Sequence, residues 1–79
     1  MNRSRVSESW IDRLVLFMPL DEQGGAGPML HGWLRGVQDD GILFAKGFYS
    51  DSHKRLMPED AKFYPWSTVG LLEPDEHRH

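Results

Sequence analysis

The chain has 79 residues, no cysteine, and a formal net charge of −3 from nine basic and twelve acidic residues. A chain of this length forms one small domain that buries only about 60% of its unfolded surface, and without cysteines neither disulfides nor zinc–thiolate clusters can stabilise it. Its charge gives no general attraction to nucleic acid. No stretch approaches the roughly 18 apolar residues of a membrane span, so we expect a cytoplasmic protein. Because the core is small and has no covalent cross-links, we expect barrel closure or oligomerisation to stabilise it.

The N-terminal part predicts a flexible arm, residues 1–6, followed by a short helix over residues 8–13. Ser7 can cap this helix, and apolar residues recur at four-residue spacing along one of its faces. The competing interpretation is a strand that begins at Trp10, but the charged residues after Ile11 interrupt its alternation. We therefore expect a short helix that leads directly into the first strand.

Three predicted strands follow this helix. Residues 14–18 are a continuous apolar run ended by a proline, which predicts a strand buried on both faces, the second face being covered by the N-terminal helix or by a neighbouring subunit. Residues 29–38 predict a second strand whose two glycines allow it to bend sharply. Asp40-Gly41 is a strong hairpin signal and leads to a third strand at residues 42–46.

Residues 47–60 are long for a connection and predict an irregular loop, which makes them a candidate functional segment. The predicted domain is then completed by a fourth strand, a tight turn and a fifth strand at residues 61–64, 65–68 and 69–72. The single domain spans residues 7–73, and residues 74–79 predict a flexible charged tail. This order predicts a mainly β fold: a small, strongly bent, five-stranded antiparallel barrel with a short N-terminal helix and a one-turn helix before the last strand.

A glycine motif in the second strand resembles a known family. Gly32-x-Leu34-x-Gly36-Val37 is similar to the first motif of the Sm-like (Hfq-related) branch of the small SH3-type barrels, and residues 65–69 stand where that family has a one-turn connection. The resemblance covers about residues 14–72 and implies the bent barrel and assembly through edge strands. It does not extend to the residues with which those relatives hold RNA, because the hairpin at 38–42 has no asparagine and the last turn has neither Arg-Gly nor Lys-His.

No residue pattern in the sequence supports catalysis, a metal or a cofactor. The carboxylates of Asp39 and Asp40 point to opposite faces if they lie in a strand, and acids are common in hairpin turns. The glycines at 24–27 lack the Lys-Ser/Thr of a phosphate-binding loop. The acidic and histidine residues at 76–79 stand in a tail with nothing to orient them as metal ligands. We expect a protein that is not an enzyme, with no cofactor and no metal.

Two sets of residues are candidates for binding. Aromatic side chains can contact a peptide or a stacked base, and the alternative is that they fill the core and a subunit interface. The basic residues can contact nucleic acid, although interleaved acids at 51, 59 and 60 favour a solvated loop of mixed charge. The predicted partner-binding residues are Trp33, Tyr49, Tyr64 and Trp66, and the predicted nucleic-acid-binding residues are Lys46, His53, Lys54, Arg55 and Lys62.

The sequence as a whole favours a non-catalytic small-barrel module that forms homo-oligomers and binds a protein or peptide partner through exposed aromatic residues. The first alternative is an Sm-like protein that binds single-stranded RNA or DNA. The second alternative is a monomeric SH3-type adaptor for extended peptides. We expect no membrane partner in any of the three cases.

Overall fold

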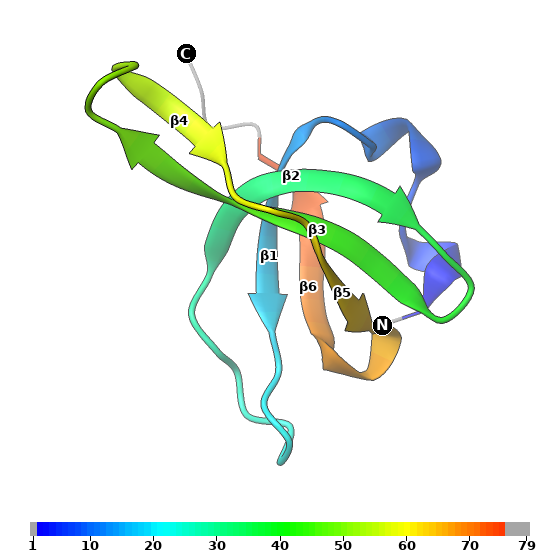
Figure 1. The fold of residues 1–79 in the computed structure, drawn as a ribbon. Coiled ribbons are helices and arrows are strands. Elements are labelled where there is room, and N and C mark those ends of the chain that lie inside the picture. Colours follow the sequence, from blue (N-terminus) through cyan, green and yellow to red (C-terminus); the bar gives the residue numbers. More distant parts are fainter. Residues whose placement is uncertain (1, 76–79) are drawn as a thin grey trace.

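Six strands form one antiparallel sheet in the computed structural model, which describes residues 2–75 (Figure 1). The mainly β prediction is therefore confirmed. The strands are β1 (Leu14–Pro19), β2 (Leu30–Val37), β3 (Gly41–Ser50), β4 (Arg55–Pro58), β5 (Lys62–Pro65) and β6 (Val69–Pro74).

The number of strands differs from the prediction because residues 47–60 are not an irregular loop. Their first part extends β3 to Ser50, and their second part contains β4, which pairs with that extension. The strand order is β4-β3-β2-β1-β6, and β5 pairs with the other half of β3. Within the described residues no pairing joins β5 to β6, so hydrogen bonds do not close the sheet.

Three short 3₁₀ helices connect or precede the strands. The predicted helix over residues 8–13 is only the single turn η2 (Glu8–Trp10), although Ser7 caps it as expected by accepting a hydrogen bond from the Ser9 N–H. The helix ends early because Asp12 adopts a positive φ of 68° and its N–H donates to the carbonyl of Leu34, which starts the sheet. The predicted one-turn helix before the last strand is present as η3 (Trp66–Thr68).

Both ends of the described chain pack onto the domain. The predicted arm contains the turn η1 (Arg3–Arg5), and Val6, only 7% exposed, belongs to the hydrophobic core. At the other end, Pro74 stands opposite Val15 and the Asp75 N–H donates to the carbonyl of Leu14, so the sheet continues past the predicted boundary at residue 73. The rest of the predicted tail, residues 76–79, lies outside the described residues.

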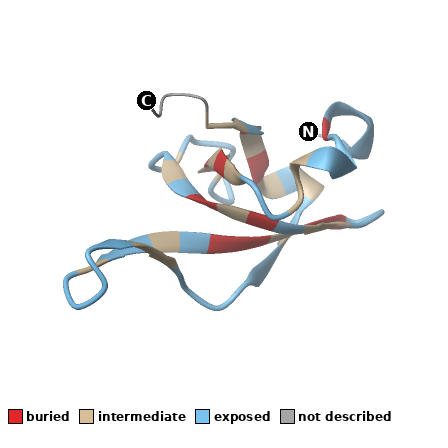
Figure 2. Cartoon of the chain, turned by 90° about the horizontal axis from the view of Figure 1, so that it is seen from above, coloured by how far each residue is buried: buried red, intermediate tan, exposed pale blue. Residues whose placement is uncertain are grey.

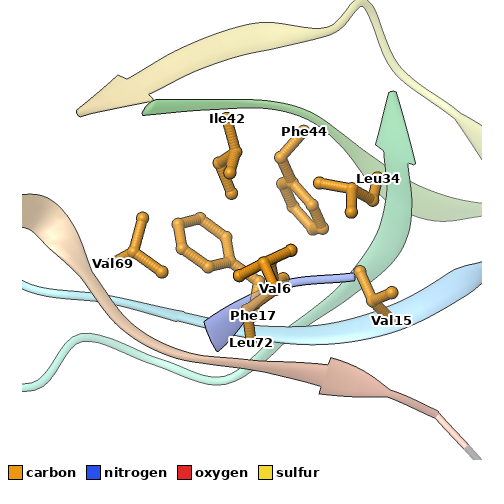
Figure 3. Close-up of a cluster of buried hydrophobic side chains, with 8 residues drawn as sticks. All are labelled: Val6, Val15, Phe17, Leu34, Ile42, Phe44, Val69 and Leu72. Atoms are coloured by element: carbon orange, nitrogen blue, oxygen red, sulfur yellow. The ribbon is translucent and has the colours of Figure 1, made fainter. Parts of the chain in front are cut away.

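The hydrophobic core lies inside the curved sheet (Figures 2 and 3). The ring of Phe17 lies 4.8 Å from the ring centroids of both Phe44 and Tyr64, so three strands meet in one aromatic cluster. On β1 only alternate residues are fully buried, whereas the run at 14–18 predicted burial on both faces. The largest fully buried side chains are Val15, Phe17, Leu34, Ile42, Phe44 and Val69. None of the helices within residues 2–75 has the length and apolar character needed to cross a membrane.

Candidate interaction surface

The β3–β4 hairpin extends beyond the rest of the sheet. Pairing of β2 with β3 ends at Gly32 and Lys46, whereas β3 continues to Ser50 and pairs there only with β4 (Figure 1). The turn between the two strands is tight because Lys54 adopts a positive φ of 60° and its N–H donates to the carbonyl of Ser50 over 2.7 Å. Within the turn, His53 Nδ1 lies 3.0 Å from Ser50 Oγ. This hairpin, residues 47–58, carries two exposed large hydrophobic side chains, Phe48 and Tyr49.

Alternation along the two strands gives the hairpin two different faces. Phe48 stands opposite Met57, and Tyr49 stands opposite Leu56. Since successive strand residues point to opposite faces, the first pair lies on one face, which we call the Phe48 face, and the second pair lies on the other, the Tyr49 face. The side chain of Phe48 is 43% exposed and that of Tyr49 is 60% exposed. Each face of the hairpin therefore presents an aromatic ring to solvent.

The four aromatic residues predicted to bind a partner do not come together. Tyr49 lies on the hairpin, and Trp33 is half-buried on β2 between Leu14 of β1 and Ala45 of β3. Tyr64 faces the core, where its ring packs edge-on against Phe17. These positions leave Tyr49 as the exposed member of the predicted set.

Trp66 has a structural role at the base of η3. Its indole N–H lies 2.9 Å from the carbonyl oxygen of Asp39 and 3.1 Å from that of Gln38, and its ring packs against the hydrophobic core. Trp66 therefore ties the turn before β6 to the β2–β3 turn. Its neighbouring proline suggested exposure, but the carbonyl partners that hold it half-buried are 27 and 28 residues away in the sequence.

Two further exposed aromatic residues belong to the aromatic set in the sequence but were not among the four predicted to bind a partner. Phe48 lies on the hairpin, and Phe63, 43% exposed, stands opposite Leu43 on the outer face of the sheet. The signal was present in the two Phe-Tyr dipeptides, because adjacent strand residues cannot both face one core. That rule was applied to residues 63 and 64, where it is confirmed, and not to residues 48 and 49, which were taken as a loop.

The predicted basic residues are exposed but spread over several elements. Lys46 and Arg55 lie on the Phe48 face by strand alternation, His53 and Lys54 lie in the turn, and Lys62 lies on β5. In the described part of the chain, none of these five side chains forms an ion pair within 4.0 Å. The guanidinium Nε of Arg55 donates to the sulfur of Met57 over 3.2 Å, which aligns the two side chains along β4.

Ion pairs lie instead around the N-terminal segment and β2. Arg3 bonds Asp39 at 2.6 Å and Glu8 at 2.5 Å. These hydrogen bonds, chiefly the one to Asp39, raise the pKa of the Arg3 guanidinium above its ordinary value. Asp39 of the Asp39-Asp40 pair is thus engaged with the N-terminal segment, and the backbone carbonyl of Asp40 accepts a hydrogen bond from the backbone N–H of Trp66. On the far side of the sheet, His31 Nδ1 lies 3.5 Å from the nearly buried Asp75 carboxylate.

Residues 2–75 contain no group of three or more His, Asp or Glu side chains placed to hold a metal ion. The predicted weak ligands at 76–79 fall beyond the described chain. Family models, curated proteins and solved structures all give no match to this protein. Its function therefore has to be inferred from the surface itself.

Proposed function

We propose that this protein is a non-catalytic binding and assembly module that self-associates and binds a partner through exposed aromatic side chains. The observation that supports this most directly is the β3–β4 hairpin, which extends past β2 and exposes Phe48 on one face and Tyr49 on the other. A two-stranded hairpin is only marginally stable in water by itself. Burying its rings against another chain would remove apolar surface from water and stabilise both partners.

The proposal includes a barrel of the SH3 type, related to the Sm-like branch. The support is that the core lies inside the curved sheet and that the three residues of η3 join β5 directly to β6 (Figure 1). In the hydrogen-bonded order, β4 and β6 stand at the two ends. Strands at the end of a sheet offer backbone donors and acceptors to another chain. Assembly through such a strand would pair the backbone groups at its open edge.

The test is the molar mass of the purified, nucleic-acid-free protein, measured by light scattering over a dilution series. We expect a discrete multiple of 9.1 kDa at high concentration. Phe48→Ser and Tyr49→Ser are compared with the matched control Met29→Ser, which changes a residue of similar exposure (48%) just before β2. We expect Phe48→Ser to reduce the oligomer and Met29→Ser to leave it unchanged. A monomeric mass for the unmodified protein at every concentration would refute self-association.

A further inference from the structure

We infer that two copies of this chain pair through the open edges of their β4 strands, antiparallel and about a two-fold axis at Met57. The inference rests on the proposed self-association and specifies its partner strand and register. β4 stands at the end of the strand order and, within the described residues, pairs only with β3 (Figure 1). Its other edge is therefore available to a second strand.

The backbone of β4 is suited to such pairing. The Glu59 N–H donates to the carbonyl of Lys46 at 2.8 Å, so by alternation the backbone groups of Arg55, Met57 and Glu59 point to β3. Those of Leu56 and Pro58 then point to the open edge. Because proline has no N–H, placing Pro58 there removes no donor from the bonds to β3. At the open edge, the N–H of Leu56 and the carbonyl of Pro58 remain as donor and acceptor.

Symmetry restricts the registers in which two β4 strands can pair. Residues directly opposite each other in an antiparallel pair point to the same face of the sheet, whereas neighbours in one strand point to opposite faces. A two-fold axis perpendicular to the sheet therefore cannot lie between two neighbouring residues of the strand, and must place one residue opposite the same residue of the second copy. An axis at Met57 places Leu56 opposite Pro58 of the second copy. The N–H of Leu56 can then donate to the carbonyl of Pro58 of the second copy, and symmetry repeats this hydrogen bond once more. It also places Arg55 opposite Glu59 of the second copy, again twice by symmetry.

Charge favours this register over its two neighbours. An axis at Leu56 would place Arg55 opposite Met57, and an axis at Pro58 would place Met57 opposite Glu59 and Lys54 opposite Lys62. Of these three registers, only the axis at Met57 places the Arg55 of each copy opposite an acidic residue, Glu59, of the other copy. Neither Arg55 nor Glu59 forms an ion pair within its own described chain, so both are available. Opposite charges that face each other across strands stabilise pairing.

The same register extends the apolar row that begins at Phe48. Phe48 stands opposite Met57 in β3–β4 pairing, and Met57 would stand opposite its symmetry mate. One apolar row, Phe48–Met57–Met57–Phe48, then crosses the interface on the Phe48 face. Contacts of this kind between neighbouring strands are the main source of sheet stability, and a methionine sulfur adds a favourable contact with an aromatic ring. Met57, which lies beside Phe48, is thereby flanked on its open side without any change in the fold.

Charge exchange tests the register. Arg55→Glu and Glu59→Arg each replace two attractive pairs by two repulsive ones, so we expect the dimer dissociation constant to rise about tenfold in each. The double variant Arg55→Glu/Glu59→Arg restores both pairs with reversed polarity and should return to within about threefold of the unmodified protein. Arg13→Glu, an exposed change of equal charge outside the interface, is the matched control. Single variants without effect, or a double variant weaker than either single one, would refute the register while leaving self-association intact.

Cross-linking provides a second and independent measurement. The chain has no cysteine, so Met57→Cys introduces its only thiol. The Cα atoms of a non-hydrogen-bonded antiparallel pair lie about 4.5 Å apart, which is within the range of a disulfide. We expect Met57→Cys to form a covalent dimer on mild oxidation and Tyr49→Cys, more exposed but on the opposite face, to form much less. Equal cross-linking of both variants would contradict the axis at Met57, and a monomeric protein would refute the inference together with the proposed function.

Discussion

Gly32 is a residue at which the sheet tolerates little change. A Cβ atom added there would lie 2.2 Å from the carbonyl oxygen of Ala45 and 2.7 Å from the ring of Phe44. Both neighbours are themselves buried, so neither can move without displacing β3 or the aromatic cluster. Gly32 thus allows β2 and β3 to approach closely and lets the Phe44 ring pack against bare backbone.

We expect Gly32→Ala to lower the free energy of unfolding by about 2 kcal/mol or more, as overpacking of a filled core does. Gly36→Ala on the same strand is the control, because its added Cβ would meet only the side chain of Leu43, most closely its flexible end at 3.3 Å. Urea unfolding followed by tryptophan fluorescence measures both. If the two variants had equal stability, the close approach at Gly32 would not limit the packing of the sheet.

The residue scale also shows what local sequence reasoning cannot provide. Trp66 was identified as a residue at a turn, yet its position is decided by carbonyl groups of residues 38 and 39. Tyr64 and Phe63 were correctly expected to face opposite ways, but alternation alone does not say which of them faces Phe17. Register between distant strands decides such questions, and register is set by long-range pairing.

At the scale of elements, the N-terminal segment is part of the domain. Val6 is buried in the core, Trp10 and Ile11 pack against it, and Arg3 links the segment to Asp39 in the β2–β3 turn. A chain of this size has few large buried side chains, so each additional one contributes a substantial part of its stability. The segment therefore acts as a cover over the core.

We expect Val6→Ala to lower the free energy of unfolding by about 1–2 kcal/mol, at roughly 0.8 kcal/mol for each buried CH₂ group removed. Arg5→Ala, which changes an exposed neighbour in the same segment, should leave it almost unchanged. The measurement is again urea unfolding. Equal midpoints for Val6→Ala and the unmodified protein would show that the segment does not dock in solution.

The elements that the sequence predicted well are those with strong local signals. The apolar run of β1, the Asp40-Gly41 turn and the turn before β6 all appear at the expected places. β4 was missed because four residues that include Arg55 and Pro58 carry no alternation strong enough to distinguish a strand from a loop. β4 forms because the extended part of β3 pairs with it and because Lys54 adopts the positive φ that the turn between the two strands requires. The helix over residues 8–13 was overextended, because the bond from Asp12 to Leu34 belongs to tertiary structure.

At the scale of the whole molecule, composition and length indicated one small domain without disulfides or zinc–thiolate clusters. The strand and hairpin patterns indicated a mainly β architecture, with which the structure agrees. The candidate surface was less accessible to prediction. Tyr49 and the basic residues could be named from the sequence, but their division between two hairpin faces depends on pairing of β3 with β4. In the dimer that we propose, Glu59, which the sequence suggested only as a counter-charge, stands opposite Arg55 of the second copy.

Self-association predicts that the stability of this molecule depends on its concentration. For a dimer that unfolds to monomers, a tenfold rise in concentration stabilises the folded state by about 1.4 kcal/mol per mole of dimer. We expect the urea midpoint to rise accordingly across a hundredfold concentration series. Arg55→Glu should show a smaller rise at low concentrations, where it is already dissociated. Superimposable unfolding curves for the unmodified protein would indicate a folding unit of one chain.

The opposite orientation of Phe48 and Tyr49 has a consequence for ligands. An axis perpendicular to the sheet keeps like faces on the same side, so a pair joined at β4 would align both Phe48 faces in one row and present both Tyr49 faces side by side on the other surface. Two equivalent contact areas a few strands apart form a bivalent platform. A partner with two copies of a recognition segment, joined by a linker that spans that short distance, would be retained by avidity even if each single contact were weak.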